Sequence, residues 1–389
     1  VKTTGFTAVS GVGYFVNTTA GIITVTLPAS PSAGDVVAVS DYAGTADTNN
    51  ITIGRNGSNI NGAAADLIVA QENSAVTLVY VDGTQGWKAT DTSSLTDLEL
   101  QPSYVTATGG TITTSGDCKI HTFTGPGTFT VSTLGNPVGG PSAVDYLVVA
   151  SGGGGGGSKS STGAGGGSGG GAGGYRTSFP SPAGTISVTT TAYPITVGAG
   201  GTAGTGCSTV IGNNGGNGNQ SIFSTIISAG GGGGRGGPCG SQGGEPGGSG
   251  GGASGGNPAC RTGGSGNTPP VSPSQGNNGG NTGPLSSPEA YHSAGGGGAG
   301  GVGGNAQQAA PLSPAPRAGG SGASNSISSS SITYAAGGLG GNYLGRACGV
   351  SGTTNTGNAG TGASGPGSPN SVGGAGGSGI VVIRYKFQN

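Results

Sequence analysis

The sequence predicts all-β N-terminal modules followed by a glycine-rich sandwich of polyglycine-II helices with flanking β-strands, and essentially no α-helix. Three observations support this. Glycine supplies 96 of 389 residues, about a quarter, against a usual share of about 7%. The glycines are uneven, with 19 in residues 1–150 and 77 in residues 151–389. No apolar pattern of period 3.6 persists along the chain. These features exclude an ordinary helical or α/β enzyme.

Residues 1–92 are predicted to form a β-rich module. Short runs of β-branched residues are separated by turn residues, as expected for strands joined by turns. The runs are Thr24–Leu27, Asp35–Val39, Ile51–Ile53 and Ala75–Val81. Asp82-Gly83 precedes Trp87, which predicts a hairpin whose return strand buries this only tryptophan.

Residues 93–103 are predicted to be a linker, and residues 104–143 a β-hairpin connector. The linker is polar and then acidic. Within the connector, apolar and polar residues alternate on both sides of the Gly-Pro-Gly turn at 125–127. This pattern predicts a hairpin over residues 121–131.

Residues 144–389 are predicted to be the polyglycine-II domain, which closes with a strand over 380–387. It opens with the apolar run Val144–Ala150. Similar apolar segments recur along this region, each next to glycines, as a loose repeat. Such a glycine content is typical of disorder, but the recurring strands favour a folded region.

Short three-residue glycine frames explain how this region could fold. One frame comprises Gly163, Gly166, Gly169 and Ala172, and another comprises Gly244, Gly247, Gly250, Ala253 and Gly256. An extended left-handed helix with three residues per turn places each frame on one face. Helices with a bare face can approach closely and exchange backbone hydrogen bonds. The glycine periodicity is interrupted too often for collagen.

We expect no enzyme activity, cofactor or metal. Gly153–Ser160 is similar to a phosphate loop, but the glycines that follow cannot form the helix such a loop requires. The nucleophile-elbow pattern at 166–170 has no aspartate downstream to complete a triad. His121 and His292 lack ligand-spaced partners. The five cysteines contain no Cys-x-x-Cys pair, and Cys118 is expected to stay unpaired.

The charge balance gives no support for a nucleic-acid partner or for membrane insertion. The 12 basic and 13 acidic residues give a net charge of −1, and the longest apolar runs are far shorter than the about 20 residues of a membrane span. Residues 1–150 hold 4 basic and 11 acidic residues, whereas residues 151–389 hold 8 and 2. This separation is consistent with electrostatic steering or with two sparsely charged surfaces.

Several motifs resemble the glycine-rich domain of bacteriophage tail fibres and adhesins. They are residues 121–131, 144–157, 171–176, 193–201, 267–273 and 379–385. The first region, through motifs such as 27–31 and 51–57, resembles a β module of marine and cyanobacterial phage fibres. The cysteines and the proline-rich segment 311–316 depart from the family pattern. A similar glycine-rich fold is implied for the extracellular part of anaplastic lymphoma kinase, so the fold alone does not establish a phage origin.

The resemblance implies an extracellular virion appendage, a homotrimer that contacts other tail proteins. It also implies receptor-binding loops that attach the virion to a host glycan or outer-membrane protein. Aromatic rings stack on sugars and arginine donates paired hydrogen bonds. From the segments between glycine runs we therefore select Tyr291, His292, Tyr343 and Arg346 as receptor-binding candidates. The segments are 158–162, 202–210, 238–242, 284–292 and 342–348. The alternatives are a purely structural fibre and, less favoured, an antifreeze-like protein, which would need a regular surface array.

The resemblance and the short strands of residues 1–92 together predict a homotrimer. Short strands leave edges that a closed oligomer covers. Multi-angle light scattering should give three times the chain mass at micromolar concentration. A monomer under these conditions would contradict the prediction.

Overall fold

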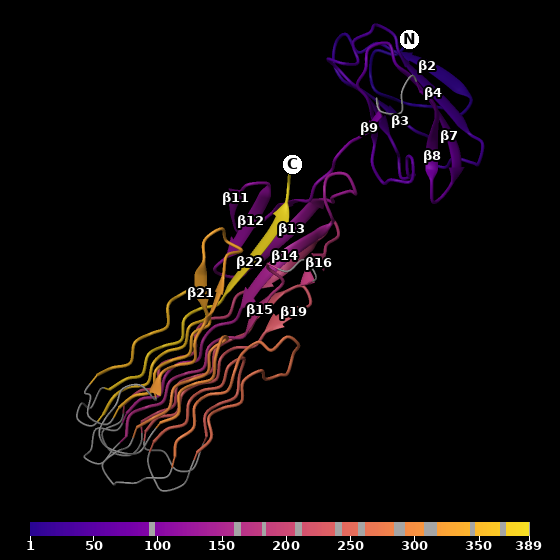
Figure 1. The fold of residues 1–389 in the computed structure, drawn as a ribbon. Helices are drawn as coiled ribbons and strands as arrows, with labels where there is room; N and C mark the ends of the chain where they lie inside the picture. The colour runs from indigo at the N-terminus through magenta and orange to yellow at the C-terminus, as the bar shows by residue number, and fades with distance from the viewer. Residues whose placement is uncertain are drawn as a thin grey trace.

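The computed structural model shows an elongated molecule of two parts (Figure 1). It describes residues 1–92, 98–158, 165–180, 184–206, 212–237, 243–255, 261–283, 292–306, 317–342, 347–365 and 371–388. A β module lies at the N-terminal end. The second part begins with further sheets and continues as a bundle of long segments that lie side by side with aligned axes and extend away from the module. Among the described residues, none forms a helix of the length and apolarity that crossing a bilayer requires.

Two sheets face each other in the N-terminal module. One consists of β1 (Phe6–Thr7), β3 (Ile23–Thr26), β5 (Ile51–Gly54), β6 (Leu67–Val69) and β9 (Leu98–Leu100), in that order. The other consists of β2 (Val12–Val16), β4 (Val36–Asp41), β7 (Ala75–Asp82) and β8 (Gly86–Thr92). Alternating residues of β4 are buried, which gives each strand one core face. The β7–β8 hairpin forms as predicted, and Trp87 is fully buried in the core between the sheets.

The second part also begins as two facing sheets. The first has the order β10 (Thr106–Thr108), β13 (Gly127–Thr133), β17 (Ala192–Thr196), β18 (Ser221–Phe223) and β19 (Ile226–Ser228). The second has the order β11 (Thr111–Ser115), β12 (Cys118–Phe123), β22 (Ile380–Lys386), β14 (Ala143–Val149) and β15 (Tyr175–Thr177), and β16 (Ile186–Ser187) pairs with β14. We call this pair the base sandwich. Cys118 lies in β12 and carries no disulfide.

The two apolar runs at the ends of the glycine-rich region pair with each other, because β14 and β22 are neighbours. Tyr146 and Val148 face the core of the base sandwich, whereas Leu147 and Val149 face a second core. A hairpin of β20 (Ala323–Asn325) and β21 (Ile332–Tyr334) contributes Tyr334 to that second core. The central strands are therefore buried on both faces, and this explains why their sequences are continuously apolar.

The hairpin predicted over residues 121–131 is wrong. Both strands exist, but β12 pairs with β11 and β22, whereas β13 pairs with β10 and β17. The Gly-Pro-Gly segment therefore connects two facing sheets. Phe123 and Phe129 both enter the core between them, so burial of the aromatic rings overrides local strand pairing.

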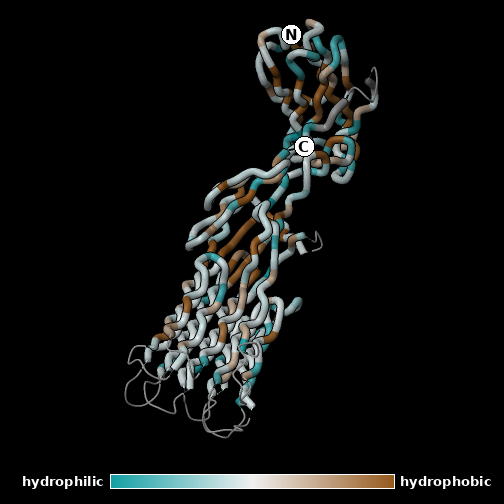
Figure 2. The backbone as a smooth tube through the Cα atoms, turned by 60° about the vertical axis from the view of Figure 1, so that its left-hand side comes forward, coloured by the Kyte–Doolittle hydropathy of each residue, from teal (hydrophilic) through white to brown (hydrophobic). Residues whose placement is uncertain are grey.

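Beyond the base sandwich, the chain forms extended segments whose backbone hydrogen bonds go to neighbouring segments, and we call these segments rods. Successive N–H groups of the rod 151–158 donate hydrogen bonds in turn to carbonyl groups of residues 212–219, 371–379 and 165–174. Its carbonyl groups accept hydrogen bonds from N–H groups of residues 198–206, 229–237 and 358–365. It thus has six neighbours, and every third residue faces the same one. This is the three-residue periodicity of polyglycine-II helices. Figure 2 shows the change from hydrophobic strands to a bundle of intermediate hydropathy.

The three-residue frame that ends at Ala172 is present in the described part of the rod 165–174. Gly169 and Ala172 donate to Ala294 and Gly297 of one neighbouring rod. The frame predicted over 244–256 does not form a single helix. Gly244 and Gly247 bond to the rod 261–266, whereas Gly250 and Ala253 bond to the rod 276–283.

A repeated Asn-Asn-Gly-Gly-Asn motif lies at the surface of the bundle. It occupies residues 213–217 and 277–281. In the first copy, Asn214 and Asn217 accept hydrogen bonds from the N–H groups of Gly236 and Gly233, at 3.0 and 2.7 Å. In the second copy, Asn278 and Asn281 accept from Gly266 and Gly263, both at 2.8 Å. These exposed side chains therefore satisfy backbone donors where a further rod would otherwise be needed.

The bundle interior should reject even one methyl group. A Cβ at Gly155 would overlap the Thr361 carbonyl of a neighbouring rod, whereas a Cβ at Gly283 meets nothing within 4 Å. Gly155→Ala should therefore lower the unfolding free energy by about 3 kcal/mol or more, at or beyond the upper end of ordinary overpacking.

The matched variant Gly283→Ala should unfold at the wild-type temperature in differential scanning calorimetry. Equal melting temperatures for Gly155→Ala and the wild type would show that the rods are not in close backbone contact.

A buried imidazole joins β12 to the C-terminal strand. His121 Nδ1 lies 2.7 Å from the Gly109 carbonyl oxygen, so it carries a proton and donates. Nε2 then accepts from the Tyr385 hydroxyl at 3.0 Å, and that hydroxyl oxygen accepts the Ala107 N–H at 3.1 Å. Burial lowers the pKa of His121, opposed by the bond to Gly109, and the charge of Lys119 lowers it further. Burial also raises the pKa of Tyr385 to about 12. The network therefore requires a neutral imidazole.

Folding stability should fall as the pH decreases from 7.5 to 5.5. The folded-state pKa of His121 lies below its ordinary value of 6.5, so the unfolded chain binds the proton first. The contribution is complete above pH 6.5 and is lost as the pH falls toward the folded-state pKa, by at most about 1.4 kcal/mol per pH unit.

Thermal unfolding across this pH range measures the effect. His121→Gln, which removes the titrating ring, should flatten part of the dependence. A wild-type curve that is flat from pH 7.5 to 5.5 would refute the assignment.

Candidate functional site

The rods end together at the tip of the bundle, far from the base sandwich (Figure 1). The described rods reach this tip at residues 158, 165, 206, 212, 237, 243, 255, 261, 283, 292, 306, 317, 342, 347, 365 and 371. Most of the segments selected from the sequence connect these ends. The tip therefore brings together rod ends that are far apart in sequence.

Three of the four receptor-binding candidates, Tyr291, Tyr343 and Arg346, lie outside the described residues. His292 is described, and it begins the rod 292–299. Its side chain is buried, at 6% exposure, so it lies beneath the surface of the tip. The role of all four in binding stays a prediction.

His292 lies near a second buried basic residue, Arg317, which is 8% exposed. Both are held against the rod 335–342, because Ser293 N–H donates to Gly341 and Gly340 N–H donates to the Arg317 carbonyl. Burial lowers the pKa of His292, and the positive charge of Arg317 lowers it further. Burial also lowers the pKa of Arg317. The pair thus combines a neutral imidazole with a desolvated guanidinium.

Two other arginines link rod ends at the tip. Arg235 forms an ion pair with Glu245 at 2.6 Å and donates to the Gly243 carbonyl at 2.7 Å. Arg261 donates to the Ser254 carbonyl at 3.0 Å. Their long side chains reach across to neighbouring chain segments and satisfy carbonyl groups there. Neither arginine was selected from the sequence. Arg235 directly follows the glycine run 230–234, which is the signal that could have indicated it, whereas Arg261 follows Cys260 and not a glycine.

Parts of the selected segments belong to the rods themselves. Residues 202–206 form the end of a rod, in which Thr205 accepts from Asn213 N–H at 2.8 Å. Ser158 and Asn342 likewise end rods, and Cys348 lies near the start of the rod 347–353. The remaining parts of those segments lie outside the described residues. These described residues of the selected segments are therefore part of the rods.

Tyr175 and Arg176 have structural contacts at the base. The Tyr175 hydroxyl accepts from Asn325 Nδ2 at 2.8 Å, which attaches the β20–β21 hairpin to β15. Arg176 Nη1 donates to the Ile227 carbonyl at 3.4 Å. Within the described ranges, no three His, Cys, Asp or Glu side chains come together as a metal site.

The geometry defines one unit that runs from β12 through the bundle to β22. A family model described as a glycine-rich domain matches residues 122–386, more than half of the chain, and its limits fall in these two paired strands. No curated protein matches the chain. The chain therefore belongs to the glycine-rich domain family.

Proposed function

We propose that this protein is a receptor-binding subunit of a phage tail fibre or a comparable adhesin, and that it binds a host-surface receptor through the tip of its bundle. The observation that carries the proposal is the convergence of the rod ends at one tip, opposite the N-terminal module. One end would then attach to the particle, and the other would face the host.

The packing of the bundle supports this division of roles. Interior glycines such as Gly155 have no space for a side chain, so these positions of the rods should tolerate few amino-acid substitutions. This constraint applies to the glycines inside the rods. Recognition residues concentrate on loops that a rigid scaffold positions, because such loops can vary without disturbing the core.

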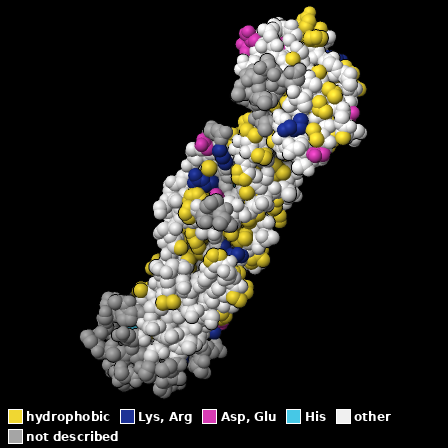
Figure 3. Space-filling view, turned by 45° about the vertical axis from the view of Figure 1, so that its right-hand side comes forward, with side chains coloured by type: hydrophobic (Ala, Val, Ile, Leu, Met, Phe, Trp, Pro, Cys, Tyr) yellow, Lys and Arg dark blue, Asp and Glu magenta, His cyan; other side chains and the backbone are white. Residues whose placement is uncertain are grey.

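The surface chemistry of the rods also favours the tip as the place where a receptor is recognised. Uncharged polar groups and backbone dominate the bundle in the face shown in Figure 3, and charged side chains are sparse there. Exposed positions such as Thr202, Asn214 and Asn217 present only small side chains. The tip supplies Arg235 and Glu245, and the candidates selected from the sequence add two tyrosines and an arginine. We propose a host glycan or outer-membrane protein as the partner, and the outside of the virion as the location.

Cell binding by the full chain tests the proposal. The triple variant Tyr291→Ala, Tyr343→Ala, Arg346→Ala should bind susceptible cells at least tenfold more weakly, because the variant lacks the aromatic and guanidinium contacts. Labelled protein and flow cytometry over a panel of marine bacteria and cyanobacteria provide the measurement.

The matched control removes two exposed aromatic residues and one cation from the opposite end, as Phe15→Ala, Tyr42→Ala, Lys88→Ala. This control should bind like the wild type, and both variants should retain the wild-type melting temperature. If wild-type protein bound no strain, the purely structural fibre would be favoured. Equal binding by the tip variant and the wild type would exclude the tip residues.

A further inference from the structure

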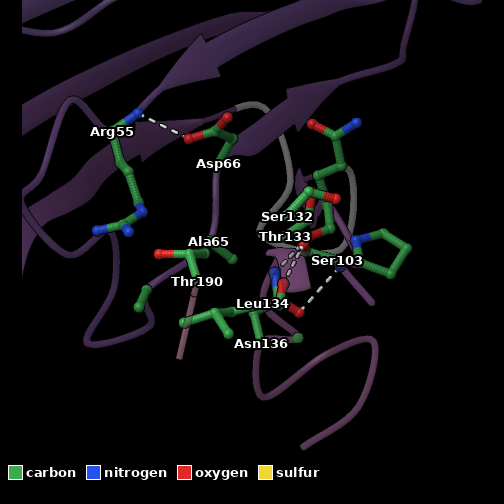
Figure 4. A pocket seen from close by; sticks show the side chains of 13 residues that line it. Arg55, Ala65, Asp66, Ser103, Ser132, Thr133, Leu134, Asn136 and Thr190 are labelled. Carbon is green, nitrogen blue, oxygen red and sulfur yellow. Dashed lines mark hydrogen bonds between the residues drawn. The ribbon is translucent and has the colours of Figure 1, made fainter. Parts of the chain in front are cut away.

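A cavity of about 630 Å³ lies at the joint between the N-terminal module and the base sandwich (Figure 4). We call it the joint cavity. Its size falls within the roughly 300–1,000 Å³ of small-molecule sites, which occur preferentially at domain interfaces. Its walls come from five segments: 55 and 64–66 of the module, 101–103 between the two parts, and 132–136 and 190 of the base sandwich.

Hydrogen bonds hold these walls in place. Gln101 N–H donates to the Asp66 carbonyl at 2.8 Å, which fixes the connecting segment to the module. Asn136 is 8% exposed and donates from Nδ2 to the Gln101 carbonyl at 2.8 Å. Its Oδ1 accepts the Ser103 N–H at 3.1 Å, and Ser103 Oγ donates to the Leu134 carbonyl at 2.8 Å. The cavity is therefore preformed, which reduces the entropy cost of binding.

Several polar groups of the lining remain available to a ligand. Asp66 uses Oδ1 to accept the Arg55 N–H at 2.8 Å, which leaves Oδ2 available. The Arg55 guanidinium makes no hydrogen bond within the described part of the chain, and in Figure 4 its side chain extends away from the Asp66 carboxylate. Thr133 and Thr190 of the base sandwich are exposed and add hydroxyl groups to the lining.

The lining also has an apolar part. Ala65, Pro102 and Leu134 contribute carbon surface. The cavity therefore offers a cation, a carboxylate, hydroxyls and an apolar surface within one space. Charged donors and acceptors form the stronger hydrogen bonds with hydroxyl groups, and carbon surface packs on the C–H faces of sugar rings.

We propose that the joint cavity binds a short neutral oligosaccharide. One positive and one negative side chain line it, so its local charge is balanced and favours an uncharged ligand over an anion. One sugar hydroxyl would accept from Arg55, another would donate to Asp66, and others would meet Thr133 and Thr190. The ligand would contact both parts of the molecule. This site is separate from the tip and does not depend on the receptor proposed there.

Isothermal titration calorimetry with the full chain tests the proposal. The neutral probes are maltotriose, cellotriose, mannotriose and N,N′,N″-triacetylchitotriose, with trigalacturonate as an anionic comparison. At least one neutral probe should bind, and trigalacturonate should bind at least tenfold more weakly than that probe.

Arg55→Ala and Asp66→Asn should each weaken binding of that probe at least tenfold. Asp66→Asn keeps an Oδ1 acceptor for the Arg55 N–H, so the loop at residue 55 should stay in place. Lys88→Ala removes a cation from the same module outside the cavity and should leave affinity unchanged. The Tyr291, Tyr343, Arg346 tip variant should also bind the probe normally, which separates this site from the proposed receptor function.

Three outcomes would overturn the proposal: no neutral probe binds, the anionic probe binds as tightly, or Arg55→Ala and Asp66→Asn retain affinity while folded. A second measurement guards against indirect effects. Saturating probe should raise the melting temperature of wild-type protein and not that of Thr190→Phe, whose larger side chain would take up part of the ligand space.

Discussion

The backbone hydrogen bond between neighbouring rods is the interaction on which the glycine-rich half depends. Each such bond contributes only about 0.5–1.5 kcal/mol net, and ordering glycine costs more entropy than ordering any other residue. The bundle offsets this cost through the large number of backbone hydrogen bonds, since the rod 151–158 exchanges hydrogen bonds with six neighbouring rods. Close approach is possible only where Cβ is absent. Glycine is thus required here for contact between backbones, more than for unusual backbone angles.

The base sandwich makes this arrangement specific. Rods of nearly uniform composition could slide past each other by three residues without losing many bonds. The strands β14 and β22 prevent this because they continue directly into the rods 151–158 and 371–379, and their side chains occupy defined places in two cores. Side-chain packing in the sheets therefore fixes the register that the backbone bonds alone leave open. His121 and Tyr385, which join the first and last strands of this unit, strengthen the same connection.

Local sequence patterns predicted many elements of this fold. Features that depend on contacts between residues distant in sequence were not predicted. The β7–β8 hairpin and burial of Trp87 followed from turn residues and alternation, and the lack of α-helix among the described residues followed from composition. The hairpin at 121–131 was wrong because pairing of β12 with β22 depends on residues more than 250 positions apart. Burial of His292 could not be predicted, since Arg317 and the rod 335–342 are distant in sequence. The joint cavity was missed for the same reason: its lining comes from separated segments without a common motif.

The asparagines of the two Asn-Asn-Gly-Gly-Asn motifs affect where the bundle of rods ends at its outer surface. A hexagonal array of rods has no intrinsic boundary, because every outer rod presents unpaired donors and acceptors to any similar chain. In this respect it resembles the open edge of a β-sheet, which invites aggregation. Asn214, Asn217, Asn278 and Asn281 occupy such donors with their own amide oxygens. These side chains therefore block the positions at which a further rod from another chain could bind. The array of rods is limited in this way to one molecule of defined width.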